Sequence, residues 1–446
     1  MLHRKQQGPH VINSQNLKWA LLIIIFIHTG WSTFGPFIRD DDLVASNNTS
    51  TGNSEGQLGT SSTGRTEVNS ISNLPALLRS NGQMQAYLKL HRSSLQTTSD
   101  KSLRVKKGTP LLVWSNRDNV NGGIGDRVKG MLGAFLFAIC TNRIFLVEYV
   151  HPTNLDQVLV AAGLIHWDAS FSEDDVDDGF LNLIDQAHEV NQDPGLLSLD
   201  SKYNSLGMRV STNSWGNFTS SSSLLEDLLA PYGNTFSLEA QHDLFYTLFQ
   251  FTPAAKLRAE SMLSLPNAGE DYIAAHVRTG DSSFINEFWK GSGRKHVGRH
   301  PRHAGGDVPQ QFFSCAQKLQ TGMKDLGRPH RPMIYIASDE EATKTRIRDL
   351  DPQSIVLAKN MTLLHVGRED QKGYESKKVA GHLDAWAEIL ILANSACIVG
   401  SRSGYSDLAV ALSNRQRPLA RCGLKFWECN ETGIKNALAN LANDNS

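Results

Sequence analysis

The alternation of short apolar strands with helices in the second half of the chain constrains its fold most strongly. Parallel strands need a crossover connection, usually a helix, so this alternation is typical of a parallel sheet covered by helices on both faces. The predicted strands are 272–277, 333–337, 355–357 and 396–400, and the predicted helices are 309–326, 338–350, 383–394 and 404–412. The sequence therefore predicts an α/β fold.

The predicted strand 272–277 leads into two side chains suited to an anion. His276 and Arg278 are two residues apart, so they lie on the same side if the strand persists, and Gly280 then allows a sharp turn. Ligands of open α/β sheets bind at the carboxyl ends of strands. Because a guanidinium fork matches two phosphate oxygens at once, the stretch predicts a phosphate site. The alternative is that Arg278 forms a simple salt bridge at the strand end.

A glycine-rich loop in the first half of the chain also follows a predicted strand. The βαβ unit comprises a strand at 110–114, the loop Gly122-Gly-Ile-Gly-Asp-Arg127, a helix at 128–140 and a strand at 144–147. Glycines at this place let the backbone approach a diphosphate, and the helix start offers free amide groups. The loop matches neither the Gly-x-Gly-x-x-Gly fingerprint nor a P-loop. A tight structural turn is the alternative, and Asp126 suits a sugar hydroxyl better than a phosphate.

Two further strand ends carry acidic or hydroxyl side chains. Asp339 follows strand 333–337, where a carboxylate can accept hydrogen bonds from a ribose or a guanine edge. The hydroxyl-rich stretch 401–406 follows strand 396–400 and suits phosphate or ribose at a helix start. Capping of the helices that follow is the alternative for both, and residues 338–341 form a capping-box pattern.

An apolar segment near the amino terminus predicts a membrane anchor. Residues 19–38 carry no charge, and about 20 apolar residues are enough to span a bilayer as a helix. Arg4, Lys5 and Lys18 precede this segment, and acidic residues follow it at 40–42, which predicts a cytoplasmic amino terminus. A cleaved signal peptide is the alternative, although no small-residue cleavage site is evident.

The segment after the predicted anchor has the composition of a stem. Residues 39–108 are rich in Ser, Thr, Asn and Gly and predict a mostly disordered stem with one short helix at 74–90. The N-glycosylation sequons begin at Asn47, Asn48, Asn217, Asn360 and Asn430, which fits a chain in the secretory lumen.

Charge and cysteine spacing argue against several classes. The net charge of −1 gives no overall attraction to nucleic acid. No cysteine has metal-site spacing, and no Asp-x-Asp stands between a strand and a loop, so no metal is predicted. A basic loop at 294–303 could attract an anionic nucleotide or acceptor, and a solvated mobile loop is the alternative.

A disulfide is predicted near the carboxyl terminus. The lumen is oxidising and the loop from Cys422 to Cys429 is short, so these two are expected to pair. The alternatives are that both are unpaired, or that either one pairs with Cys140, Cys315 or Cys397.

The order of these motifs resembles the fucosyltransferase superfamily of α1,2-, α1,6- and protein O-fucosyltransferases. The shared motifs are the Gly-Gly-x-Gly-Asp/Asn-Arg loop, His-x-Arg, Ala-Ser-Asp at a strand end and Ser-x-Ser after a strand, and the stretch 122–147 is most similar to the plant xyloglucan and nodulation-type members. The resemblance covers 110–148 and 271–412 in patches. It implies a GT-B-like fold of two Rossmann-like domains facing a cleft, GDP-fucose as the donor, inversion, and no metal or other cofactor.

The resemblance also implies roles for individual residues. His276 and Arg278 match the donor-binding pair, with Arg278 on the diphosphate, and Asp339 matches the acidic nucleoside-binding residue. Arg278 is expected to stabilise the departing GDP, and Asp281 or Glu287 is expected to act as the base for the acceptor hydroxyl. Further donor contacts are predicted at Gly123, Gly125, Asp126, Arg127, Ser401, Ser403, Gly404 and Tyr405. Asp126 departs from the Asn that many members carry.

Together these patterns predict a single-pass type II Golgi membrane glycoprotein that transfers fucose to a glycan or glycoprotein. The alternatives are a GT-B transferase with another nucleotide sugar, and a membrane-anchored glycan-binding protein that binds no GDP. The acceptor stays open because 150–270 matches no motif, although 224–229 and 238–251 read as helices. The predicted segments are a cytoplasmic tail at 1–18, the transmembrane anchor at 19–38, the stem at 39–108, an acceptor-side Rossmann-like domain at 109–268 and a donor-binding domain at 269–446.

Overall fold

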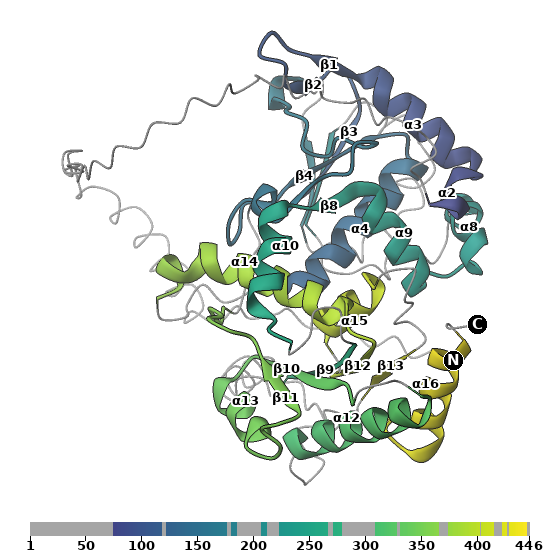
Figure 1. Cartoon of the computed structure of the whole chain (residues 1–446). Helices are drawn as coiled ribbons and strands as arrows, with labels where there is room; N and C mark the ends of the chain where they lie inside the picture. The colour runs from purple at the N-terminus through teal and green to yellow at the C-terminus, as the bar shows by residue number, and fades with distance from the viewer. Residues whose placement is uncertain are drawn as a thin grey trace, which may run out of the picture. The chain divides into compact units, whose positions relative to one another are not determined.

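The computed structural model describes a folded part that carries the predicted motifs (Figure 1). All of the described residues lie within the unit Thr66–Ser446. They are 75–117, 122–175, 180–184, 207–211, 223–265, 271–278, 308–327, 331–364, 373–401, 403–413, 422–425 and 428–443. Within these ranges no helix is long and apolar enough to cross a bilayer. The predicted tail and anchor at 1–38 fall outside them.

A four-stranded parallel sheet forms the first half of the fold. Its strand order is β4-β3-β7-β6, and every neighbouring pair is parallel. The strands are β3 (Leu111–Ser115), β4 (Ile144–Glu148), β6 (Phe180–Ile184) and β7 (Gly207–Ser211), and α4 (Ile124–Cys140) connects β3 to β4. All five residues of β3 are buried, since Leu112 and Trp114 belong to the same core as α4 while Leu111 and Val113 pack in a second core. The predicted βαβ unit is confirmed.

A five-stranded parallel sheet forms the second half. Its order is β11-β10-β9-β12-β13, again parallel throughout. The strands are β9 (Tyr272–Val277), β10 (Met333–Ser338), β11 (Ile355–Leu357), β12 (Cys397–Gly400) and β13 (Gly423–Lys425). The central position of β9 explains why its six residues are all buried.

Helices cover both faces of this second sheet (Figure 1). Ile273, Ala275 and Val277 pack in the core formed with α12 (Val308–Asp325). Tyr272 and Ala274 belong to the core shared with α14 (Tyr374–Ala393) and α15 (Gly404–Ala411). Because side chains alternate along a strand, His276 lies on the α14–α15 side. The alternation predicted from the sequence therefore decides which face receives the histidine.

The other elements frame the two sheets. They are α2 (Ala76–Arg79), α3 (Gly82–Ser94), β1 (Leu95–Thr97), β2 (Leu103–Val105), β5 (Leu159–Ala161), α8 (Ser223–Leu229), α9 (Leu238–Leu248), β8 (Phe249–Phe251), α10 (Pro253–Met262), α13 (Glu341–Arg348) and α16 (Glu431–Asn443), with 3₁₀ turns η2 (Leu155–Gln157), η3 (Glu173–Asp175) and η4 (Ala230–Tyr232).

The predicted stem extends too far along the chain. Residues from 75 onward fold, and α3 is capped by Asn81, whose side chain accepts a hydrogen bond from the Met84 amide at 3.0 Å. Met84, Tyr87 and Leu88 are buried, and the Tyr87 hydroxyl accepts a hydrogen bond from the Phe145 amide in β4. Two helices, α2 and α3, replace the single helix predicted at 74–90. Average composition did not indicate that this helical segment packs into the fold, because only one face of α3 is apolar.

Helix starts were less predictable than helix types. The capping box was placed at Ser338, whereas α13 begins at Glu341 after Glu340, and the Ser338 hydroxyl accepts from the Glu340 amide at 3.2 Å. The helix predicted from 383 begins at Tyr374. Its polar first turns lack the apolar periodicity on which the prediction relied.

The predicted disulfide between Cys422 and Cys429 is wrong. Cys397 pairs with Cys422, and Cys315 pairs with Cys429, which leaves Cys140 as a buried free thiol. The parallel register places Ile398 beside Gly423, so the preceding residues Cys397 and Cys422 meet at the strand starts. Closeness in the chain was a poor guide because the sheet brings distant cysteines together.

Candidate functional site

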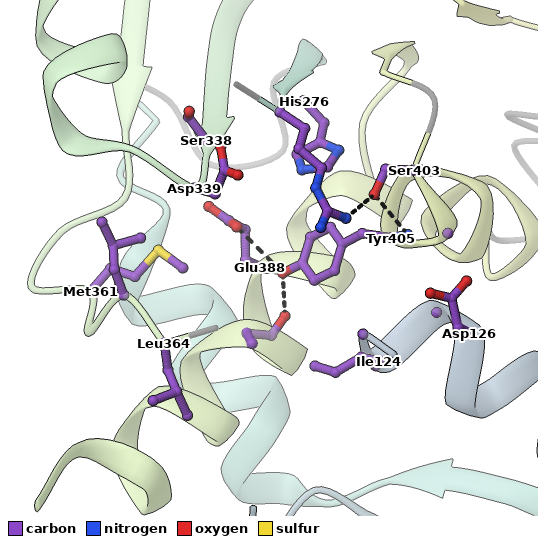
Figure 2. Close-up of a pocket in the computed structure, with 16 residues that line it drawn as sticks. Ile124, Asp126, His276, Ser338, Asp339, Met361, Leu364, Glu388, Ser403 and Tyr405 are labelled. Atoms are coloured by element: carbon purple, nitrogen blue, oxygen red, sulfur yellow. Dashed lines mark hydrogen bonds between the residues drawn. The ribbon is translucent and has the colours of Figure 1, made fainter. Parts of the chain in front are cut away.

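A pocket lies where the carboxyl ends of β9 and β10 face the starts of α4 and α15 (Figure 2). One part of its wall is polar, and another is formed by aliphatic side chains. Its lining residues are Gly123, Ile124, Gly125, Asp126, His276, Arg278, Ser338, Asp339, Met361, Leu363, Leu364, Ala385, Glu388, Ser403, Gly404 and Tyr405. The pocket therefore brings together the glycine-rich loop, the His-x-Arg motif, Asp339 and part of the Ser-x-Ser loop. Each of these motifs is recognisable separately in the sequence.

The starts of α4 and α15 approach each other very closely at this pocket. A Cβ on Gly125 would lie 2.0 Å from the carbonyl oxygen of Gly404, and a Cβ on Gly404 would lie 2.6 Å from Asp126 Oδ1. Gly125 is thus required by helix packing because its neighbour is backbone, whereas a Cβ on Gly404 would mainly displace the Asp126 side chain. Gly123 has open space around its Cβ position and is the N-cap of α4, so it is the glycine that leaves backbone accessible to a ligand.

Arg278 is oriented by the start of α15. Its Nη1 donates a hydrogen bond to Ser403 Oγ at 3.2 Å, and the same oxygen accepts from the Tyr405 amide at 3.3 Å. Ser403 is the N-cap of α15. A fixed guanidinium and two helix N-termini all line one pocket, and this arrangement favours an anion.

His276 is a buried neutral side chain beside the arginine. Its Nδ1 is 2.6 Å from Ser406 Oγ and 3.3 Å from Ser401 Oγ, and its ring centroid lies 5.1 Å from that of Tyr405. Burial lowers the pKa of His276 to about 4. At neutral pH the ring therefore carries no charge and serves as a fixed hydrogen-bonding wall.

Glu388 is an acidic lining residue that the sequence analysis missed, as it also missed the aliphatic residues Met361, Leu363 and Leu364. It comes from α14, and its Oε1 accepts a hydrogen bond from the Tyr335 hydroxyl at 3.1 Å. Its Oε2 lies 3.3 Å from the Tyr405 hydroxyl, which also donates to the Ala385 carbonyl at the shorter distance of 2.6 Å (Figure 2). Burial raises the pKa of this carboxyl, while Lys344 and the two hydroxyls act in the opposite direction. The signal that could have identified it is an acidic residue in a mostly apolar helix segment, although Asp384 in the same segment shares that signal.

The apolar wall lies across the pocket from Ser403 and Tyr405. Figure 2 shows Met361 and Leu364 on this side, and Leu363 also lines it. Behind Met361, the buried ammonium of Lys344 lies 3.6 Å from the Met361 sulfur. The wall is thus apolar toward the pocket, with a cation immediately behind it.

Two of the predicted donor-binding residues do not line the pocket. Arg127 is buried in the core, where its Nε donates to the Gly122 carbonyl at 3.2 Å and its guanidinium carbon lies 5.5 Å from the centre of the Tyr149 ring. Ser401 is buried against His276. Both support the pocket from behind, because each holds a segment that lines it. Their predicted contact with the donor stays a prediction.

The remaining sequence predictions divide by location. Asp126 and Asp339 line the pocket as predicted. Asp281, Glu287 and the basic loop lie outside the described residues. Across the described ranges, no group of three or more His, Cys, Asp or Glu side chains is placed to hold a metal ion.

No protein-family model matches the sequence, and no curated protein matches it either. Among solved structures, a mutant of FUT1 from Arabidopsis thaliana in complex with GDP has a TM-score of 0.44 and 15% identity, covering 76% of this chain and 78% of its own. The fucosyltransferase NodZ from Bradyrhizobium has a TM-score of 0.41 and 15% identity, covering 68% and 92%. A NodZ α-1,6-fucosyltransferase structure soaked with GDP-fucose has a TM-score of 0.40 and 14% identity, covering 68% and 93%. These neighbours belong to the superfamily that the motif order resembles, but at these TM-scores they assign no activity.

Proposed function

We propose that this chain transfers fucose from GDP-fucose to a hydroxyl group of a glycan or glycoprotein. The observation that carries the proposal is Arg278, which Ser403 fixes in a pocket lined by two helix N-termini and by the buried carboxyl of Glu388. A nucleoside diphosphate sugar has chemical groups that suit each of these features. The order of the sequence motifs supports the same donor.

The diphosphate is assigned to the polar side of the pocket. Arg278 supplies a planar cation, and the amide groups at the starts of α4 and α15 supply further donors. Asp339, at the end of β10, is an acceptor suited to the ribose hydroxyls. Asp126 also lines the pocket, but its negative charge disfavours direct contact with the phosphates, so it is assigned to a sugar hydroxyl.

Guanine is the base that best suits Glu388. Its carboxyl oxygens are hydrogen-bond acceptors, and the Tyr335 hydroxyl uses only part of their capacity. The guanine edge presents two adjacent N–H donors, whereas the uracil edge presents one. The aliphatic side chains of Met361, Leu363 and Leu364 provide a surface for the flat base.

The proposed reaction is a single displacement at the anomeric carbon. The acceptor oxygen forms a bond to that carbon as the bond to the phosphate oxygen breaks, so the configuration inverts and GDP leaves. Asp281 or Glu287 takes the proton from the acceptor hydroxyl. Arg278 stabilises the charge that develops on the departing diphosphate, and we propose that no metal is needed.

The proposed location is the Golgi membrane, as a single-pass type II protein with its folded part in the lumen. The two disulfides, Cys315–Cys429 and Cys397–Cys422, support a compartment that is oxidising. Protease protection in sealed microsomes tests the topology, and digestion of the folded part without detergent would contradict it.

The activity test is a panel of nucleotide sugars incubated with the full chain and with Arg278→Ala. We expect GDP-fucose to be turned over without added metal and in the presence of a chelator, and we expect the variant to be inactive. The control is Arg331→Ala, an exposed arginine paired with Asp351 that does not line the pocket. Turnover of a UDP-sugar would identify another donor, and failure to bind any nucleotide would identify a protein without this activity.

A further inference from the structure

Two of the predicted sequons lie among the described residues, and their surroundings differ. Asn360-Met-Thr362 follows β11, whereas Asn430-Glu-Thr432 runs into α16. Both asparagines are exposed. Exposure alone therefore does not separate them, and the hydrogen bonds of the two segments decide which one presents an unused side chain.

The loop at Asn360 has a fixed backbone. Arg258 Nη2 donates to the Asn360 carbonyl at 2.6 Å, and the Thr362 amide donates to Asp384 Oδ2 at 2.6 Å. Arg258 Nε in turn donates to Asp384 Oδ1 at 2.5 Å, so one ion pair clamps the loop on both sides of Met361. Asn360 has a φ of 50°, a left-handed conformation that asparagine tolerates better than most residues.

The side chains of this sequon are not used by that clamp. Within the described ranges, neither the Asn360 amide group nor the Thr362 hydroxyl makes a hydrogen bond, because the clamp engages only main-chain atoms. Asn430 differs, since its Oδ1 accepts from the Gly433 amide at 2.9 Å and caps the first turn of α16. Thr432 lies within that helix.

We propose that Asn360 carries an N-linked glycan at the rim of the pocket. The inference rests on the proposed lumenal location, which gives access to a lipid-linked oligosaccharide diphosphate and its transferase. In the transfer, the Asn360 amide nitrogen bonds to the anomeric carbon of the oligosaccharide and loses a proton. The bond from that carbon to the diphosphate oxygen breaks, and the lipid diphosphate leaves.

The position of Asn360 gives this glycan a defined place. The next residue, Met361, has its side chain in the pocket wall, while Asn360 itself is exposed. Because the Arg258–Asp384 pair fixes the backbone on both sides of Met361, the first sugars leave the chain one residue before a residue of the pocket wall. A glycan there would border the entrance without displacing the polar wall at Arg278.

The test is to express the full chain in cells with a secretory pathway and to map its peptides after glycosidase treatment in heavy-oxygen water. We expect Asn360 to be converted to labelled Asp. Thr362→Ala should abolish this label although Asn360 is intact, and Thr362→Ser should retain it because serine preserves the sequon. Neither substitution removes the Thr362 amide that binds Asp384. Asn430→Gln serves as the matched control and should leave the label at Asn360 unchanged.

The outcomes separate the inference from the proposed location. Label at other sequons with unmodified Asn360 would overturn the inference and leave the lumenal location standing. The absence of label at every sequon, with the folded part open to protease in sealed microsomes, would overturn both. Label at Asn360 that persists in Thr362→Ala would show chemical deamidation and would also overturn the inference.

Discussion

Substitution of Gly125 by alanine should separate the two helix starts that form the pocket. The added Cβ would lie 2.0 Å from Gly404 O and 2.2 Å from Gly404 C, both of which are backbone atoms. An ordinary contact begins near 3.4 Å, so α4 and α15 must move apart by about 1.4 Å (3.4 minus 2.0). No flexible side chain can relieve this clash.

The cost follows from overpacking set against helix propensity. Overpacking in a close contact costs about 1–3 kcal/mol, and alanine recovers up to about 1 kcal/mol in a helix. Because backbone must move, we take the upper end and expect a net loss of about 2 kcal/mol in the free energy of unfolding. Movement of Gly404 also carries Ser403 away from Arg278. Loss of a hydrogen bond to a charged group costs about 1.5–3 kcal/mol, so the Kd for GDP should rise about tenfold or more.

The assay is urea unfolding together with calorimetric titration of GDP on one preparation. Gly123→Ala is the matched control, because it lies in the same loop and no atom lies within 4 Å of its Cβ position. The control should change stability by less than about 1 kcal/mol, the scale of a helix N-cap substitution. An unfolding midpoint equal to that of Gly123→Ala, together with a GDP affinity equal to that of the wild type, would refute the packing argument.

The remaining predictions concern charge. Arg278→Lys should lower kcat about a hundredfold or more with little change in melting temperature, since lysine keeps the charge but loses the planar fork; near-normal kcat would remove Arg278 from the mechanism. Lys344→Met should raise the pKa of Glu388 further, so the affinity for GDP should fall more steeply as the pH is lowered than in the wild type, while UDP binding does not change; identical pH profiles would contradict this. Burial lowers the pKa of both His91 and His382 to about 3. As the pH falls, these histidines bind protons in the unfolded chain before they do so in the folded chain. The free energy of unfolding should therefore have its full value above pH ~6.5 and fall by up to about 1.4 kcal/mol per pH unit per histidine as the pH drops toward 3. Urea unfolding measured against pH tests this, and His382→Gln should flatten the curve.

The sequence by itself determined the parallel sheets and the residues at their strand ends. Strand β9 is apolar at every position before His276, which is the pattern of a strand buried on both faces. Its side-chain period of two then places His276 on the side away from Ile273 and Ala275. Arg278, Asp339 and Ser403 are brought together because parallel strands end at one edge of the sheet. Local pattern was sufficient for these features, since each depends on neighbours in the chain.

Only the tertiary structure decided how distant segments meet. Glu388 reaches the pocket because α14 packs on the face of the sheet that carries Tyr335, which no local pattern encodes. Arg127 turns into the core because the Gly122 and His151 carbonyls accept its N–H groups there. The Cys397–Cys422 pairing depends on the register of β12 with β13. Each of these outcomes is set by contacts between residues far apart in the sequence, and the energy of such contacts exists only once the chain has folded.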